Sequence, residues 1–141
     1  MSKRILFIST SRTGYGHKSI TDSICEEINR IEPSIKTDVV DGFLMGKKMI
    51  EFIGDLYSPV AKNAPRLWKA CYKLCGVRPS YVNAFTAFNI KNGLKDIIRD
   101  TRPDLVVSLH AGFVGAVHDI MDEMKVRVPL VVQVADLDHI T

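Results

Sequence analysis

Short apolar runs alternate with helical patterns along the chain. Four runs rich in β-branched residues, at 5–9, 37–40, 105–109 and 130–134, are nearly unbroken in apolar character and are bounded by Pro, Asp or Gly. Such runs are typical of strands that are covered on both faces. Helical periodicity occupies residues 19–31, 85–99 and 113–124. Because strands that alternate with helices pair in parallel through right-handed crossovers, the pattern predicts an α/β fold, a Rossmann-like parallel sheet with helices on both faces.

The connection between the second and third predicted strands is longer than the others. It spans residues 41–104, several times what one crossover helix requires. Residues 45–57 within it have helical periodicity, and Pro65 opens a second helix in a favourable first-turn position. We therefore expect one domain over residues 1–141, with a helical insertion at about 42–82.

Composition and cysteine content place limits on the class of protein. The chain has 141 residues, 46% of them hydrophobic, which is ordinary for one globular domain. Cys25, Cys71 and Cys75 form no CxxC pair and have no zinc-finger spacing, so we interpret them as reduced core thiols of a cytosolic protein. No apolar run approaches the roughly 20 residues of a membrane span, and the N-terminal run is too short for a secretion signal.

The net charge of +3 is unevenly distributed. Between residues 42 and 80, seven basic residues stand against two acidic ones, so this segment carries +5 and the rest of the chain −2. The basic residues are Lys47, Lys48, Lys62, Arg66, Lys69, Lys73 and Arg78. A basic segment flanked by acidic ones indicates a specific anionic partner and not general nucleic-acid binding.

A glycine-containing loop follows the first predicted strand, where parallel α/β proteins often bind ligands. Gly14 and Gly16 allow close approach of the backbone, and a helix N-terminus attracts anionic groups. The Walker pattern is excluded because His17 stands where it requires glycine. The dinucleotide fingerprint G-x-G-x-x-G is met except for Ser19 at the third glycine. With Asp38 or Asp41 as the ribose-binding acid, an NAD(P)-binding domain therefore remains an alternative.

Histidine and aspartate residues follow three of the predicted strands. We expect His17 directly before the first helix, whose dipole disfavours the charged imidazole and leaves the ring able to accept a hydrogen bond. His110 follows the run at 105–109, and Asp136, Asp138 and His139 follow the run at 130–134. Since the carboxyl ends of parallel strands share one edge of a sheet, these side chains are predicted to meet there.

Four segments together resemble a known family. They are "TGYGHKSITDSI", "LYSPVAKNAPRLWKACYK", "RPDLVVSLHAG" and "VPLVVQVADLDH". In order and spacing they are similar to the N-terminal domain of monogalactosyldiacylglycerol synthases and processive diacylglycerol glucosyltransferases, and the glycine loop is similar to that of the N-acetylglucosaminyltransferase that makes lipid II. The resemblance covers nearly the whole chain.

This resemblance implies a two-domain, inverting glycosyltransferase of the GT-B type without a bound metal or other cofactor. The N-terminal domain would receive a diacylglycerol-like acceptor, and a C-terminal domain, absent from this chain, would bind the UDP-sugar. His17 would face the acceptor hydroxyl, and Asp136 would be the base that deprotonates it. The implied substrate-binding residues are Gly14, Tyr15, Gly16, Trp68, Tyr72, His110 and His139. The chain alone is expected to be inactive, and a non-catalytic lipid-binding or partner-binding module remains a further alternative.

The insertion would then have a role at the membrane. Lys62, Arg66, Lys69 and Lys73 would face anionic headgroups beside the aromatic residues, where each basic residue contributes about 1 kcal/mol. We therefore expect a protein bound peripherally to the cytoplasmic face of a membrane, with no nucleic-acid partner. A second interpretation remains open, in which the apolar residues around Leu67 pack on the sheet and the basic residues form a solvated face.

Overall fold

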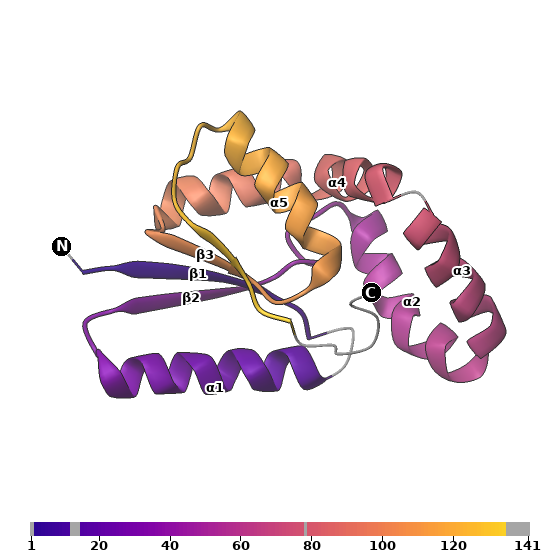
Figure 1. The fold of residues 1–141 in the computed structure, drawn as a ribbon, viewed down its shortest axis with the longest axis horizontal. Coiled ribbons are helices and arrows are strands. Elements are labelled where there is room, and N and C mark those ends of the chain that lie inside the picture. Colours follow the sequence, from indigo (N-terminus) through magenta and orange to yellow (C-terminus); the bar gives the residue numbers. More distant parts are fainter. Residues whose placement is uncertain (1, 12–14, 78, 135–141) are drawn as a thin grey trace.

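The computed structural model describes residues 2–11, 15–77 and 79–134 as a sheet flanked by helices (Figure 1). The elements are, in chain order, β1 (Arg4–Ser9), α1 (Tyr15–Ile31), β2 (Lys36–Asp41), α2 (Lys48–Asn63), α3 (Pro65–Val77), α4 (Pro79–Thr101), β3 (Leu105–Ser108), α5 (Ala111–Glu123) and β4 (Leu130–Val132). The four predicted strands are present, with bounds close to those of the apolar runs. The predicted class is confirmed: the protein is α/β and Rossmann-like.

All strand pairs are parallel, and the strand order is β2-β1-β3-β4. Arg4 pairs with Lys36 at the start of the β1–β2 ladder, and Ile5 pairs with Leu105 at the start of the β1–β3 ladder. Helix α1 lies on one face of the sheet, and α4 and α5 lie on the other (Figure 1). The sheet is therefore covered from both sides, as expected for crossovers between parallel strands.

Alternate residues of the central strands supply the two cores. On the α1 side, Phe7, Val107 and Leu109 are buried and contact the apolar face of α1, including Ile20, Ile24 and Ile28. The larger core, on the side of α4 and α5, contains Leu6, Ile8, Val106, Ile90, Leu94, Phe113, Val117 and Ile120. This alternation follows from the two-residue side-chain period of a strand, so one strand contributes to both layers.

Helices do not cover the outer strands as fully as the sequence pattern predicts. Val131 and Val132 of β4 are each 46% exposed, and Val39 of β2 is 52% exposed. Val131 is level with Val107 in the β3–β4 ladder, yet only Val107 contributes to the core under α1. The expectation of full coverage was wrong for β4 and β2 because α1 packs on the central strands.

The insertion forms two helices and the start of a third. Helix α3 begins at Pro65, as predicted, whereas α2 begins at Lys48, three residues later than predicted, and continues to Asn63. Together α2 and α3 extend beyond the carboxyl ends of the strands (Figure 1). The interpretation of the cysteines as core thiols was wrong for Cys71, which is exposed on α3. Cys25 is partly buried and packs against the core under α1, and the side chain of Cys75 lies outside the described part of the structure.

The insertion is tied to the rest of the fold where the β2–α2 connection meets α4. A Cβ atom at Gly93 of α4 would overlap the carbonyl oxygen of Met45, so only glycine permits this close approach. The Lys47 N–H donates to the carbonyl oxygen of Asn89, and the Lys47 ammonium lies 3.7 Å from the centroid of the Phe88 ring. These contacts fix the start of α2 against α4.

Candidate functional site

The carboxyl ends of β1 and β3 form the centre of the candidate site. The chain leaves β1 for α1 and then β2 on one side, and it leaves β3 for α5 and then β4 on the other. The order of the strands therefore reverses between β1 and β3. In open α/β sheets, such a switch point creates the crevice in which ligands bind.

His17 is the third residue of α1, which begins at Tyr15. The prediction that His17 directly precedes the helix was wrong. Its carbonyl oxygen accepts a hydrogen bond from the Thr21 hydroxyl at 2.7 Å, and Thr21 lies 2.6 Å from the hydroxyl of Ser9 at the end of β1. Ser9 and Thr21 are buried, so these hydroxyl groups tie the first turn of α1 to the end of the strand. The His17 side chain is also buried, since the residue is 6% exposed.

The structure brings His17 and His110 together. Their ring centroids are 5.2 Å apart, and the two ring planes are inclined by 38°. His110 is the N-cap residue of α5, and its Nδ1 accepts a hydrogen bond from the Gly112 N–H at 3.1 Å. The two histidines therefore come from the starts of the helices that follow the two strands flanking the switch point, although they are 93 positions apart in the sequence.

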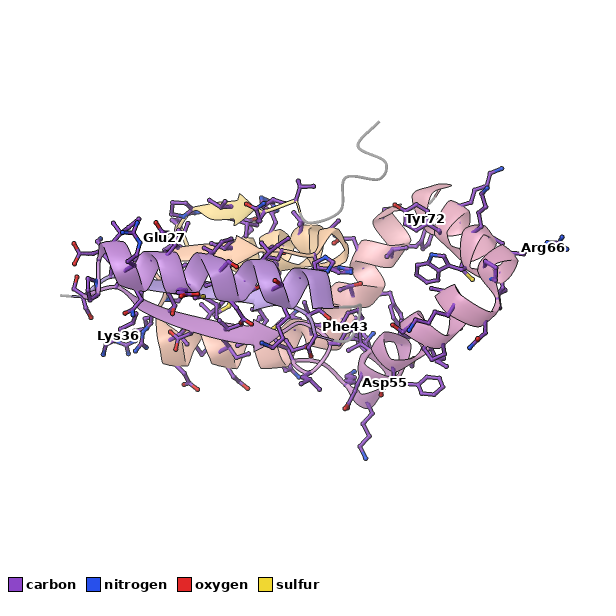
Figure 2. All side chains as sticks on the ribbon, turned by 90° about the horizontal axis from the view of Figure 1, so that it is seen from below. Glu27, Lys36, Phe43, Asp55, Arg66 and Tyr72 are labelled. Atoms are coloured by element: carbon purple, nitrogen blue, oxygen red, sulfur yellow. The ribbon has the colours of Figure 1, made fainter. Side chains whose placement is uncertain are left out.

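Two phenylalanine rings complete this cluster. The Phe113 ring lies 5.3 Å from the His110 ring, and the Phe43 ring lies 5.8 Å from it in an edge-on arrangement. Phe43 and Phe113 also contact each other, at 5.1 Å between centroids. Figure 2 shows Phe43 between the sheet and the helical insertion. The cluster therefore links the histidine pair to the segment that leads into α2.

Four residues of this site were not predicted from the sequence: Ser9, Thr21, Phe43 and Phe113. Phe113 follows His110 by three residues, a helical spacing that places a side chain near the cap, and this was the one local signal available. Phe43 follows the end of β2, where an aromatic residue is equally typical of the core. Both phenylalanines are in fact buried core residues as well as neighbours of His110.

Several predicted site residues lie outside the described part of the chain. These are Gly14, Asp136 and His139, and the side chain of Tyr15 is likewise not described. Gly16 is exposed in the first turn of α1, and within the described residues nothing beyond its chain neighbours and the backbone of its own helix lies within 4 Å of where a Cβ would stand. The proposed juxtaposition of His17 with Asp136 therefore stays a prediction.

The two aspartates considered for ribose binding are already engaged. The carboxylate of Asp41 accepts hydrogen bonds from the Ser11 N–H at 2.9 Å, the Ser11 hydroxyl at 2.8 Å and the Phe43 N–H at 2.9 Å. Asp38 lies 3.3 Å from the guanidinium of Arg4. A cleft of about 310 Å³ beside α1 is lined by residues that include Asp41, Lys18 and Asp22, and the last two form an ion pair. Asp41 thus braces the loop after β1, and this does not favour a dinucleotide site.

The insertion presents basic and apolar side chains to solvent. Lys62 at the end of α2 and Arg66, Lys69 and Lys73 on α3 are all exposed. Figure 2 shows Arg66 at the outer end of the insertion, pointing away from the sheet. Trp68 is half-buried, and its ring lies 6.4 Å from the ring of Tyr72, which is exposed.

Apolar residues at helical spacing are also exposed on the insertion. They are Met49, Phe52, Ile53 and Leu56 on α2, and Leu67 and Leu74 on α3, with exposed fractions between 41% and 70%. The interpretation in which the apolar face of α3 packs on the sheet was wrong for Leu67, Cys71 and Leu74. An exposed apolar surface of this extent is typical of a surface that contacts a partner or a membrane.

The described residues contain neither a cluster of metal ligands nor a helix suited to span a membrane. In residues 2–11, 15–77 and 79–134, no group of three or more His, Cys, Asp or Glu side chains could hold a metal ion. Within the same ranges, every helix is too short or too polar to cross a bilayer. In comparisons with known proteins, no family model, no curated protein and no solved structure matches the chain.

Proposed function

We propose that this chain is the acceptor-binding domain of an inverting glycosyltransferase that moves a hexose from a UDP-sugar to diacylglycerol or a related lipid. The observation that carries the proposal is the contact between the His17 and His110 rings at the switch point of the sheet. An imidazole pair beyond the carboxyl ends of parallel strands is suited to orienting a hydroxyl group through hydrogen bonds. The similarity of four sequence segments to glycolipid synthases supports the same activity.

The reaction is one nucleophilic displacement. A base removes the proton of the acceptor hydroxyl, whose oxygen attacks the anomeric carbon of the sugar. The bond from that carbon to UDP breaks, and UDP departs with the electron pair, so the configuration is inverted. His17 would orient the hydroxyl, and Asp136 would act as the base. Such a base typically accelerates a reaction by about 10²- to 10⁴-fold.

The insertion would hold the domain at the source of its acceptor. Diacylglycerol remains in the bilayer, so an enzyme that uses it has to work at the membrane surface. The exposed apolar residues of α2 and α3 are suited to the interface, while the adjacent basic residues are suited to anionic headgroups. The insertion lies beyond the carboxyl ends of the strands, which is the same end of the sheet as the histidine pair (Figure 1).

The test is transfer of labelled hexose from UDP-glucose or UDP-galactose to diacylglycerol, catalysed by membranes from cells that express the natural gene product. We expect a labelled glycolipid with the wild type and a loss of about 100-fold with His17→Ala, because a misplaced reacting hydroxyl typically costs about that factor. His118→Ala is the matched control, because that imidazole is exposed on α5. Transfer at the normal rate by His17→Ala, or no transfer by the wild type, would contradict the proposal.

A further inference from the structure

The two outer strands of the sheet differ in the protection of their free edges. A sheet edge presents unpaired N–H and C=O groups to other chains, and proteins commonly protect it with charged side chains. Strand β2 carries Lys36, Asp38 and Asp41, which is typical of an edge that faces solvent. The run from Leu130 to Val134, which begins with β4, carries no charged residue. The comparison indicates that the sheet ends at β2 but not at β4.

Hydrogen bonds to β3 establish which backbone groups of β4 lie at this edge. The carbonyl oxygen of Pro129 accepts a hydrogen bond from β3 at 3.0 Å, and the Gln133 N–H donates to a carbonyl oxygen of β3 at 2.9 Å. In a strand, the backbone groups of successive residues point to opposite sides. Those of Leu130 and Val132 therefore point away from β3, and in the described part of the chain no strand pairs with them.

A groove of about 490 Å³ lies beside β4 on the face of the sheet that α5 covers. Its lining includes Met121 of α5 together with Val126, Val128 and Leu130, which lead into β4. Leu130 packs against the larger core, so it faces α5. Val132 stands two residues later and faces the same way, yet it is 46% exposed. The groove and this valine form an apolar surface along the outer side of α5.

Helix α5 has a helical neighbour on one flank. On the α4 side, the Asn83 amide donates to the Asp119 carboxylate at 2.6 Å, and the Lys95 ammonium lies 2.8 Å from a carboxylate oxygen of Glu123. Met121 follows Asp119 by two residues, so it lies about 200° further around the helix, where it lines the groove. The groove therefore occupies the flank of α5 that faces away from α4.

The handedness of parallel crossovers predicts what fills this position. The strand order shows that the connection from β3 through α5 to β4 steps toward the open edge. Nearly all such crossovers are right-handed, so a further step in the same direction places its helix on the same face of the sheet. A helix after β4 would therefore pack beside α5, which is where the groove lies.

We propose that a fifth parallel strand pairs with β4 and that its crossover helix fills the groove beside α5. Both come from the segment that follows this chain in the natural polypeptide, because the backbone leaves β4 at the end where such a crossover starts and consecutive strands are usually neighbours. This source rests on the proposed function, in which a further domain follows, whereas the open edge and the groove do not. The helix presents an apolar face to Met121, Val126 and Val128.

Amide hydrogen exchange tests the strand. Exchange at Leu130 and Val132 is compared in the chain of residues 1–141 and in the natural gene product, with single residues resolved by mass-spectrometric fragmentation. We expect these amides to exchange at least about 100-fold more slowly in the natural product, while Gln133, which is bonded to β3, is protected in both. Rapid exchange in the natural product, or a natural product without a further strand, would overturn the proposal. Slow exchange in the chain alone would overturn it too, and a dependence on protein concentration would then assign the edge to a second copy.

A charge on the groove side of β4 tests the helix. Val132→Lys places an ammonium where the helix would pack, whereas the matched control, Val39→Lys, places one at a 52% exposed valine of β2. An unpaired buried charge is strongly destabilising, so in the natural product Val132→Lys should raise the unfolding equilibrium constant at least about 100-fold more than the control does. In the chain of residues 1–141 the two effects should be small and similar. Equal effects in the natural product would contradict the proposal.

Failure of this inference and failure of the proposed function have different signatures. A protected edge in a natural product that transfers no sugar would leave the fifth strand in place and contradict the proposed function. Normal transfer by a natural product whose β4 edge exchanges rapidly would overturn the fifth strand alone. The exchange measurement uses wild-type proteins, so it remains decisive even if Val132→Lys does not fold.

Discussion

Neutralising the basic residues of the insertion should weaken membrane binding by a large factor. Lys62 lies near the end of α2, and Arg66, Lys69 and Lys73 follow at helical spacing on α3; all are exposed. Near an anionic bilayer, each basic residue contributes about 1 kcal/mol, so replacing these residues with Gln removes about 4 kcal/mol. Since about 1.4 kcal/mol corresponds to a factor of ten, the affinity should fall about a thousandfold at low ionic strength.

Vesicle sedimentation measures this loss directly. The wild type and the fourfold Gln variant are compared on vesicles with phosphatidylglycerol and on vesicles of phosphatidylcholine alone. The Debye length shortens from about 30 Å at 0.01 M to about 8 Å at 0.15 M salt, so the wild type should lose affinity as salt is added. The variant should depend much less on salt and on the anionic lipid.

The control replaces two exposed lysines elsewhere, Lys36 and Lys125, with Gln, which removes half as much charge as the fourfold variant does. Lys36 lies at the opposite end of the molecule from Arg66 (Figure 2), so this control changes net charge without changing the insertion. We expect the control to keep most of the affinity for anionic vesicles. An equal loss in the control, or no loss in the fourfold variant, would refute the assignment of the insertion as the membrane-facing surface.

Three further predictions concern the fold. Gly93→Ala should lower the free energy of unfolding by about 1–3 kcal/mol in chemical denaturation, because its Cβ would overlap the backbone carbonyl of Met45. Gly76→Ala on α3, where a Cβ would meet open space, should instead raise the free energy of unfolding by about 0.5–1 kcal/mol. Cys71 is exposed, while burial raises the pKa of the Cys25 thiol, so mass spectrometry should find Cys71 alkylated before Cys25; the reverse order would contradict this. The backbone N–H of Arg4 in β1 donates a hydrogen bond to the Asp104 carboxylate and holds its pKa below the usual value of about 3.8. The ionised carboxylate therefore stabilises the fold fully above about pH 3.8, and this stabilisation is lost as the pH falls through the lowered pKa. Asp104→Asn should therefore be less stable than the wild type at pH 7, with the difference shrinking in acid; a pH-independent difference would contradict the assignment.

The strands and the alternation of helices could be predicted because local periodicity reports the layer to which a residue belongs. The extent to which helices cover each strand could not be predicted in this way. Val107 and Val131 are level in adjacent strands and equally apolar, yet α1 packs on one and leaves the other half exposed. The apolar stripe of α2 was likewise visible in the sequence, but periodicity does not say whether a protein layer, a membrane or solvent meets it.

The approach of His17 to His110 could be expected, because both follow parallel strands whose carboxyl ends share an edge. The start of α1 could not be located from the pattern of apolar residues. The first turn is secured by hydroxyl groups of Thr21 and Ser9, which are contacts that depend on the folded position of β1. The hydrogen bond from the Gly112 N–H to His110 was missed for a different reason: it is local, but a histidine side chain is not a usual N-cap.

The central position of β1 has a consequence for synthesis on the ribosome. One edge of β1 can pair with β2 once residue 41 has emerged, but the other edge must wait for Leu105, which pairs with Ile5. At about 5–20 residues per second, that edge stays open for roughly 3 to 13 s. Throughout this interval the nascent chain exposes an apolar strand edge, and chaperones that bind such edges should engage it before the third strand is made.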